Sequence, residues 1–436
     1  MTDTSAPTGH MPYEHERVRV SRRFLVLYAL ALSGVWMAIL TPAGVTVALR
    51  IGDVDPDGKT LSYSLVTGVG TLVALLANPF FGRLSDITRS RYGMRRPWIV
   101  GGMLAGGAGA LLIALFDNVF VILVGWIIMQ ASINAAIAAL VAILGDRVPD
   151  DQQGVVGGIA GMAPSAALVL GTFLVQLFPD DALASMGIPV VAGIVFAVVF
   201  ALTYRDRTPS GPRPTFGFRE LVGTFVFNPL ERRDFALLLV SLALLQTGTA
   251  VVANYTVYYL EDGLGIADDR VPFQAFVANF WTNATGVVAS LLAGWIVGRF
   301  VSHKVLLMIS GVIMTVGVLS IIVIPGLSGF TVGNILIGSG SGLYLGIYLS
   351  YATMIMDDPR NVARDLGLVN IAYALPLAVS PFVAPVLLGI GHDHNYALLL
   401  GISAIVTAVG IPIPLFIRHQ KPRLGVDDAV APPAGR

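Results

Sequence analysis

The sequence predicts an all-α integral membrane protein with twelve transmembrane helices, and three observations carry that prediction. First, 55% of the 436 residues are hydrophobic and only 12% are charged, whereas soluble domains carry about 25% charged residues. Second, the hydrophobic residues gather in runs of about 20 residues, the length that spans a bilayer. Third, these runs are continuously apolar, as in Leu111–Phe116 and Val191–Phe200, whereas the strands of a membrane barrel alternate.

Each predicted helix is an apolar run with charged residues only at or beyond its ends. In chain order, the runs cover residues 24–49, 61–82, 97–116, 119–144, 154–178, 185–204, 235–260, 272–298, 303–325, 328–356, 367–390 and 395–417. The 48 glycines of the chain fit helices that approach one another closely in lipid.

The lysines and arginines predict the orientation of these helices. Cytoplasmic segments carry an excess of both residue types. Here one side of the membrane holds only Arg50, Lys59 and Arg270, and the tails and alternate loops hold the remaining 24 of the 27. We therefore expect both termini in the cytoplasm. Arginine also greatly outnumbers lysine, as in GC-rich bacterial genomes, so we expect the plasma (inner) membrane of a bacterium.

A polar stretch divides the chain into two halves. We expect a cytoplasmic tail over 1–23, a six-helix bundle over 24–204, a cytoplasmic linker with an amphipathic helix over 205–234, a second six-helix bundle over 235–417 and a cytoplasmic tail over 418–436. Matching residues recur at one offset, because Gly82 and Gly294 are 212 residues apart and so are Pro164 and Pro376. This offset predicts two parallel six-helix repeats, an arrangement found in transporters.

One loop is specific enough to suggest a family. Between the second and third runs the chain reads Gly82-Arg-Leu-Ser-Asp86-Ile-Thr-Arg89-Ser-Arg91-Tyr-Gly-Met-Arg95-Arg96. The second half keeps a partial copy from Gly294, and Gly145-Asp146 and Asp365-Leu-Gly367 are further matches. The chain resembles the major facilitator superfamily, in the form seen in sucrose-type and glycoside–pentoside–hexuronide cation symporters. The resemblance covers nearly the whole chain and implies the major facilitator fold.

The resemblance also implies a gating role for seven residues: Gly82, Asp86, Arg89, Arg95, Asp146, Gly294 and Asp365. Asp86 would dock at the start of the eleventh run, near Asp365. A carboxylate among arginines can hold one arrangement of two bundles and release it in the other. The alternative is that these arginines only set the orientation. Ile87 and Met94 depart from the pattern, because relatives usually have arginine there.

No charge is predicted deep in the membrane. Every Asp, Glu and His lies in a tail, a loop or the end of a run, whereas buried ionisable groups are the usual proton relays and counter-ions. Relatives in the sucrose-type branch often place Asp where Gln130 and Tyr348 stand, so the proton route of that branch is in doubt here. A neutral polar solute fits this interior best.

Neutral polar and aromatic side chains do recur at helical spacing on the runs that line the central cavity in the superfamily. Amides and aromatic faces suit the hydroxyls and C–H faces of sugars, and interhelical hydrogen bonding is the alternative role. The predicted substrate-binding residues are Trp36, Trp126, Gln130, Asn134, Gln246, Asn254, Tyr258, Tyr344 and Tyr348.

The sequence thus predicts a secondary active or facilitative transporter that moves a small neutral polar solute, a sugar or glycoside, by alternating access. An exporter of a neutral hydrophobic metabolite or drug is the alternative, and a receptor-like sensor is a further one. We expect no enzyme activity, catalytic residue, metal site or cofactor. With zero net charge we also expect no nucleic-acid partner. The expected state is a monomer in the lipid bilayer, with the solute and, by resemblance, a coupling cation as partners.

Overall fold

The computed structural model describes residues 19–204, 206, 229, 231–356, 362–391 and 394–418. Nearly all of the two predicted tails and most of the predicted linker, with its amphipathic helix, lie outside these ranges. Within them, twelve helices are long and apolar enough to cross a membrane, and no strand longer than an isolated bridge occurs. The all-α membrane fold class is therefore confirmed. The domain boundaries stay predictions.

The first half contains six spans. The first span is not one continuous α-helix, because α1 (Arg22–Thr41) continues through a π-helical turn, η1 (Pro42–Thr46), into α2 (Val47–Val54). Pro42 opens this turn, and proline has no N–H to donate to the helical ladder. The other five spans are α3 (Lys59–Ile87), α4 (Arg96–Leu115), α5 (Val119–Arg147), α6 (Asp150–Val175) and α7 (Ala182–Thr203).

The second half also contains six spans. Its first span, α9 (Arg233–Tyr258), ends in a π-helical turn, η2 (Tyr259–Gly263), and a short helix, η3 (Asp268–Arg270), follows. The remaining elements are α10 (Val271–Ile296), α11 (His303–Val323), α12 (Gly326–Ile355), α13 (Val362–Leu388), α14 (Tyr396–Gly410) and η5 (Ile413–Phe416).

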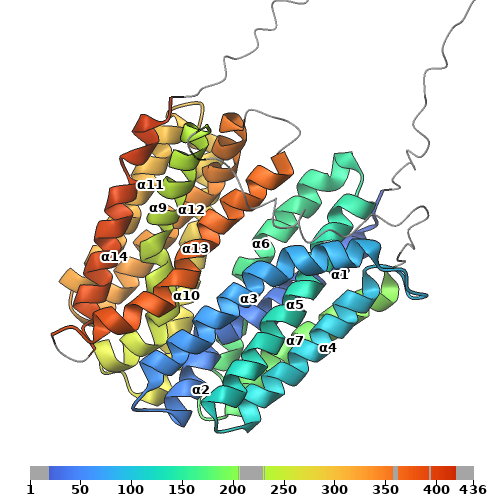
Figure 1. The fold of residues 1–436 in the computed structure, drawn as a ribbon, viewed down its shortest axis with the longest axis horizontal. Helices are drawn as coiled ribbons and strands as arrows, with labels where there is room; N and C mark the ends of the chain where they lie inside the picture. The colour runs from blue at the N-terminus through green and yellow to red at the C-terminus, as the bar shows by residue number, and fades with distance from the viewer. Residues whose placement is uncertain are drawn as a thin grey trace, which may run out of the picture.

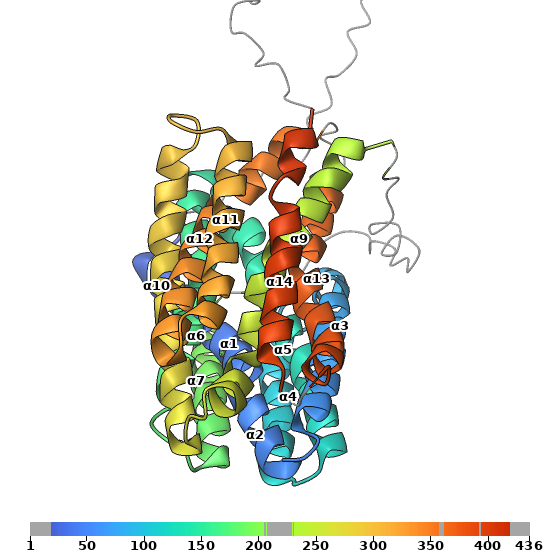
Figure 2. The ribbon, with the colours of Figure 1, turned by 90° about the vertical axis from the view of Figure 1, so that its left-hand side faces the viewer.

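The spans form two bundles side by side, α1–α7 and α9–α14 (Figure 1). We call the end of the molecule where α1 begins and η5 ends the proximal end, and the opposite end, where α2 lies, the distal end (Figure 2). Consecutive spans alternate in direction, so the six spans α3, α5, α7, α10, α12 and α14 begin at the distal end (Figure 1, Figure 2).

Close packing inside each bundle depends on glycine. A Cβ at Gly342 of α12 would overlap the carbonyl oxygen of Gly286 in α10, and a Cβ at Gly193 of α7 would overlap that of Gly34 in α1. These contacts bring backbones together without a hydrophobic driving force, as is typical of helices in lipid. They fix the bundles as stable units.

Candidate functional site

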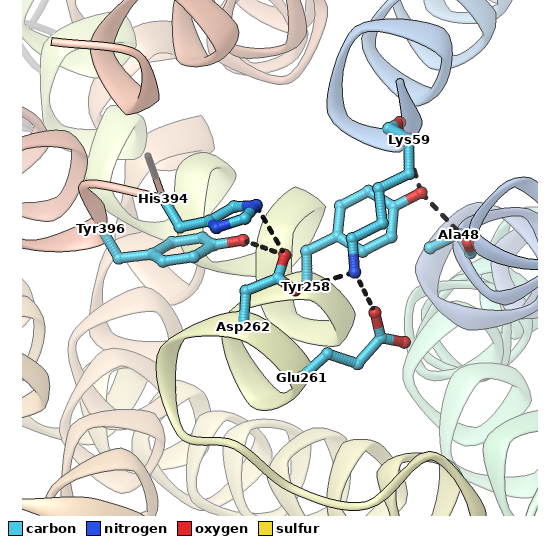
Figure 3. Close-up of polar contacts among 7 residues, drawn as sticks. All are labelled: Ala48, Lys59, Tyr258, Glu261, Asp262, His394 and Tyr396. Carbon is cyan, nitrogen blue, oxygen red and sulfur yellow. Dashed lines mark hydrogen bonds and ion pairs between the residues drawn. The ribbon is translucent and has the colours of Figure 1, made fainter. Parts of the chain in front are cut away.

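A charged cluster joins the two bundles at the distal end (Figure 3). The Nζ of Lys59, at the start of α3, lies 2.8 Å from Glu261 Oε2 and 2.8 Å from Asp262 Oδ1. The π-helical turn η2 presents these two consecutive acids together. All three side chains are largely buried, with exposed fractions of 13–17%. One ammonium group of the first half therefore serves two carboxylates of the second.

Tyrosines strengthen the same junction. Tyr258 donates a hydrogen bond to the carbonyl oxygen of Ala48 (3.1 Å), and Lys59 Nζ lies 5.1 Å from the centre of the Tyr258 ring. The hydroxyls of Ser64 and Tyr255 are 2.7 Å apart one turn deeper. We call Lys59, Tyr258, Glu261 and Asp262 the distal latch.

Two side chains at the start of α14 support Asp262, His394 just before the helix and Tyr396 as its first residue. Tyr396 donates a hydrogen bond to Asp262 Oδ2 (3.2 Å), and His394 Nε2 lies 3.6 Å from the same oxygen. Both oxygens of Asp262 thus have partners, one from each bundle. A cavity of about 610 Å³ lies beside the latch, and Lys59 and Glu261 contribute to its wall together with Arg50, Asp53 and Ser185.

At the proximal end the ion pairs that we describe stay within one bundle. Arg95, which precedes α4, lies 2.7 Å from Asp86 and 2.9 Å from Asp146, and it is 3% exposed. Burial alone would lower the pKa of Arg95, but the hydrogen bonds and charges of Asp146 and Asp86 raise it above its ordinary value. Arg232 and Asp365 form a two-pronged ion pair (2.7 and 2.6 Å) in the other half.

The contacts that join the bundles through described residues lie in the distal parts of the helices. Besides the latch, the ring of Phe382 in α13 fills the space beside Gly68 of α3, and Phe173 of α6 packs on Phe276 of α10. Nearer the proximal end, a Cβ at Gly158 of α6 or at Gly367 of α13 would meet no atom within 4 Å. The bundles are therefore closed together distally, and these proximal surfaces are unpacked.

Among the residues that the structure describes, the polar side chains midway along the bundles are neutral. In α5, Asn134 Nδ2 donates to the carbonyl oxygen of Gln130 (2.8 Å), and both residues are largely buried. In the second half, Gln246 of α9 and Tyr344 of α12 each bury a side-chain oxygen that has no hydrogen-bond partner within the described ranges. Tyr344 also stacks on Tyr348, with ring centroids 5.3 Å apart.

Comparison with known proteins identifies the family. The model of the Major Facilitator Superfamily matches residues 25–381. The chain belongs to the major facilitator superfamily. No curated protein matches the sequence. The sucrose-type branch suggested by the loop therefore stays a prediction.

Three solved structures show the same fold. A crystal structure of the nucleoside transporter NupG is 13% identical, with a TM-score of 0.69 over 90% of this chain and 99% of that one. A bacterial homologue of the human lysosomal transporter Spinster has two inward-facing structures, occupied and unoccupied. They are 14% and 15% identical, each with a TM-score of 0.61 over 91% of this chain and 95% of theirs. Membership of the superfamily makes this multi-pass membrane protein a transporter and not an enzyme, as predicted.

The structure of this superfamily member separates the predicted gating residues. Asp86, Arg95 and Asp146 come together in the first bundle, and Asp365 pairs with Arg232 in the second. The docking of Asp86 near Asp365, which the resemblance implies, stays a prediction. Arg89 lies in the α3–α4 turn, and a Cβ at Gly82 or Gly294 would meet no atom closer than 3.8 Å.

The predicted substrate-binding residues also divide. Gln130 and Asn134 lie together on α5, Gln246, Tyr344 and Tyr348 lie in one region of the second bundle, and Trp36 is half-buried on α1. Three others have neighbours that explain their burial: Trp126 packs on Gly70 of α3, Tyr258 belongs to the distal latch, and Asn254 donates to Ser380 and Leu377 of α13. Whether any of them binds solute stays a prediction.

Sequence reasoning did not place Lys59, Asp262 or Tyr373 in a site. Lys59 was visible as the lone lysine in the outer loops, and Glu261 and Asp262 as consecutive acids after the seventh run. Because about 200 residues separate these groups, spacing along the chain could not pair them. Tyr373 likewise meets Tyr344 only through the packing of α12 and α13.

Proposed function

We propose that this transporter moves a neutral polar solute, a sugar or glycoside, across the plasma membrane by alternating access, with both termini in the cytoplasm. The supporting observation is the distribution of charge. Within the described ranges, Asp, Glu, Lys, Arg and His side chains lie at the ends of the spans, and the polar groups midway along are amides, hydroxyls and aromatic rings. An ionic solute would need an opposite charge at that depth, since an unpaired charge is costly there.

Neutral groups of this kind are suited to hydroxyls. Gln130 and Asn134 offer amides from the first bundle, and Gln246 and Tyr344 offer an acceptor and a hydroxyl from the second. A buried polar atom without a partner costs about 1–3 kcal/mol. A solute hydroxyl that supplies the missing hydrogen bond would recover part of that energy, which favours binding of polyols over apolar solutes.

Alternating access is supported by the two ends of the molecule. With both termini in the cytoplasm, the distal latch is the outer gate, and the unpacked proximal surfaces face inward. Transport then requires the latch to open as the proximal ends of α6 and α13 pack against the opposite bundle. The ion pairs around Arg95 and Asp365 lie where such packing would rearrange them.

Counterflow in proteoliposomes tests the proposal. Vesicles are loaded with one unlabelled solute and diluted into the same labelled solute, so that uptake of label is driven by exit of the unlabelled solute and needs no coupling ion. We expect labelled uptake for a sugar or a glycoside and none for a sugar phosphate or a hexuronate. Uptake of a neutral hydrophobic drug, with no uptake of any carbohydrate, would instead support the exporter.

A further inference from the structure

Three tyrosine rings lie nearly parallel between α12 and α13. The Tyr344 and Tyr348 rings, one turn apart on α12, are inclined by only 5°. The ring centroid of Tyr373, on α13, lies 6.4 Å from that of Tyr344 and 6.4 Å from that of Tyr348, with inclinations of 26° and 21°. We call these three residues the tyrosine slot.

The spacing of the slot is close to that of an aromatic sandwich. Carbon atoms of stacked groups prefer separations of about 3.5–4.0 Å, so two rings that hold a third between them stand roughly 7 Å apart. The ring centroid of Tyr373 lies 6.4 Å from those of the α12 pair, a distance of similar size to that spacing. Tyr348 and Tyr373 are only partly buried, whereas Tyr344 is fully buried.

Two hydrogen bonds fix the level of the slot relative to α9. The hydroxyls of Thr249 and Ser341 are 3.2 Å apart and join α9 to α12. Asn254 donates to Ser380 (2.8 Å) and joins α9 to α13. Because α12 runs antiparallel to α9 and α13 runs parallel to it, these bonds place Gln246, one turn proximal to Thr249, at the level of Tyr344 and Tyr373.

Unpaired polar atoms lie at this same level. Gln246 Oε1 and the Tyr344 hydroxyl have no hydrogen-bond partner in the part of the chain that the structure describes, and the two residues are 4% and 0% exposed. A carboxamide and a hydroxyl offer both donors and acceptors. Parallel ring faces with such groups at their level form a site for a flat ring that carries polar atoms on its edge.

We propose that the tyrosine slot receives a planar heteroaromatic ring of the solute, and that Gln246 and Tyr344 hydrogen-bond the edge of that ring. This inference rests on the proposed function, because it describes the non-sugar part of a transported glycoside. A nucleoside, in which a sugar carries a flat nitrogen heterocycle, has the required chemistry. A simple sugar or an alkyl glycoside lacks the ring.

The test compares solutes that share a sugar and differ in the attached group. The purified full-length protein is assayed for binding of radiolabelled adenosine, and unlabelled inosine, ribose and methyl riboside are tested as competitors. We expect adenosine and inosine to bind about 5- to 150-fold more tightly than methyl riboside, the range that stacking of a base on an aromatic side chain supplies. Tyr373→Leu should remove most of that preference, and Tyr373→Phe, which keeps the ring, should retain it.

Gln246→Leu supplies an independent reading. It should weaken adenosine binding by a larger factor than methyl riboside binding, because methyl riboside has no ring edge for the amide to hydrogen-bond. Gel filtration and the thermal unfolding midpoint of each variant show whether it is folded. If Tyr373→Leu does not fold, Tyr348→Leu is used in its place.

The outcomes separate the two proposals. Equal affinity for adenosine and methyl riboside, unaffected by Tyr373→Leu, would overturn the slot, while counterflow of either solute would keep the carbohydrate function. Tyr373-dependent binding of the free base adenine, without counterflow of any sugar or glycoside, would support the slot and overturn the carbohydrate function. Failure of every solute in both assays would overturn both.

Discussion

A single ammonium group compensates the negative charge of the distal latch. Lys59 comes from the first bundle and has two acidic partners, Glu261 and Asp262, from the second. Replacing the lysine removes the cation from both largely buried carboxylates, and Asp262 keeps only Tyr396 and His394 as partners. Removing one partner of a buried ion pair typically costs more than the pair itself contributes, because the remaining charge has lost its compensation. The substitution should therefore destabilise the conformation in which the latch is closed.

We expect Lys59→Met to open the distal end. Breaking a fully buried ion pair costs about 3–5 kcal/mol, and the cost is smaller here because these side chains are partly exposed. We therefore expect the ratio of open to closed molecules to rise about tenfold. The chain has no native cysteine, so Ser64→Cys provides a reporter one turn below the latch. Its reaction with a membrane-impermeant maleimide should be about tenfold faster in the Lys59 variant.

Arg50→Met is the matched control for that experiment. Arg50 also lines the distal cavity, but its ion-pair partner, Asp117, belongs to its own bundle. Its replacement should leave the labelling rate of the reporter unchanged. Equal rates for the parent, the Lys59 variant and the Arg50 variant would contradict the latch.

Two asparagines with similar sequence signals have different surroundings. Among the described residues, Asn134 hydrogen-bonds only within α5, whereas the Asn254 amide reaches α13. Asn134→Leu should therefore abolish or sharply weaken solute binding with little effect on the thermal unfolding midpoint. A site that loses a hydrogen bond to a hydroxyl discriminates strongly against its solute. Asn254→Leu should lower the midpoint, by the equivalent of about 0.6 kcal/mol per interhelical hydrogen bond.

Binding isotherms and unfolding curves of the two variants, measured side by side in one detergent, check this difference. Normal binding by Asn134→Leu would remove that residue from the site. An unchanged midpoint for Asn254→Leu would mean that its bonds to α13 contribute nothing to the bundle.

Helix elements in this protein depend on glycine at some positions and not at others. Gly342→Ala in α12 sets a methyl group against the backbone of Gly286, and backbone cannot move aside as a side chain can. Overpacking of this kind costs about 1–3 kcal/mol, so the unfolding midpoint should fall by several degrees. Gly158→Ala in α6, where the new methyl group meets no atom within 4 Å, is the control and should not lower it. A midpoint that falls equally in both variants would refute the packing argument.

Sequence patterns predicted the elements better than the contacts between them. Run lengths placed the twelve spans because lipid imposes length and apolarity on each helix separately. Helical spacing also put Tyr344 and Tyr348 on one face of α12. It could not show that Tyr373 of α13 completes the stack, nor that Lys59 meets Glu261 and Asp262, because such pairs arise from the docking of whole helices. Asn254 shared the spacing of a binding residue, and only the structure shows its bond to Ser380.

At the scale of the whole molecule, titratable groups lie at the two ends and neutral groups lie between them. Coupling by protonation at the solute site needs a group that titrates and is exposed to each side in turn. Within the described ranges no Asp, Glu or His lies midway along a span. We therefore expect a pH gradient alone to drive no uphill accumulation of solute in proteoliposomes.

The measurement imposes the pH gradient at equal solute concentrations inside and outside, with a sodium gradient in a parallel sample. Facilitated movement, or accumulation driven by sodium alone, agrees with the expectation. Robust accumulation that a protonophore abolishes would show that an acid near a span end, with Glu261 as the first candidate, reaches the transport pathway.

Because lysine is scarce in this chain, chemical modification of Lys59 can report on the state of the distal latch. The chain has three lysines, Lys59, Lys304 and Lys421, and Lys59 keeps its amine between two carboxylates while the bundles are closed distally. An ammonium group held in this way is a poor nucleophile, and it becomes accessible to an acylating reagent only after the carboxylates move away. Mass spectrometry of the acetylated protein would then record, as the modified fraction at Lys59, how often the unaltered transporter opens outward, without any engineered probe.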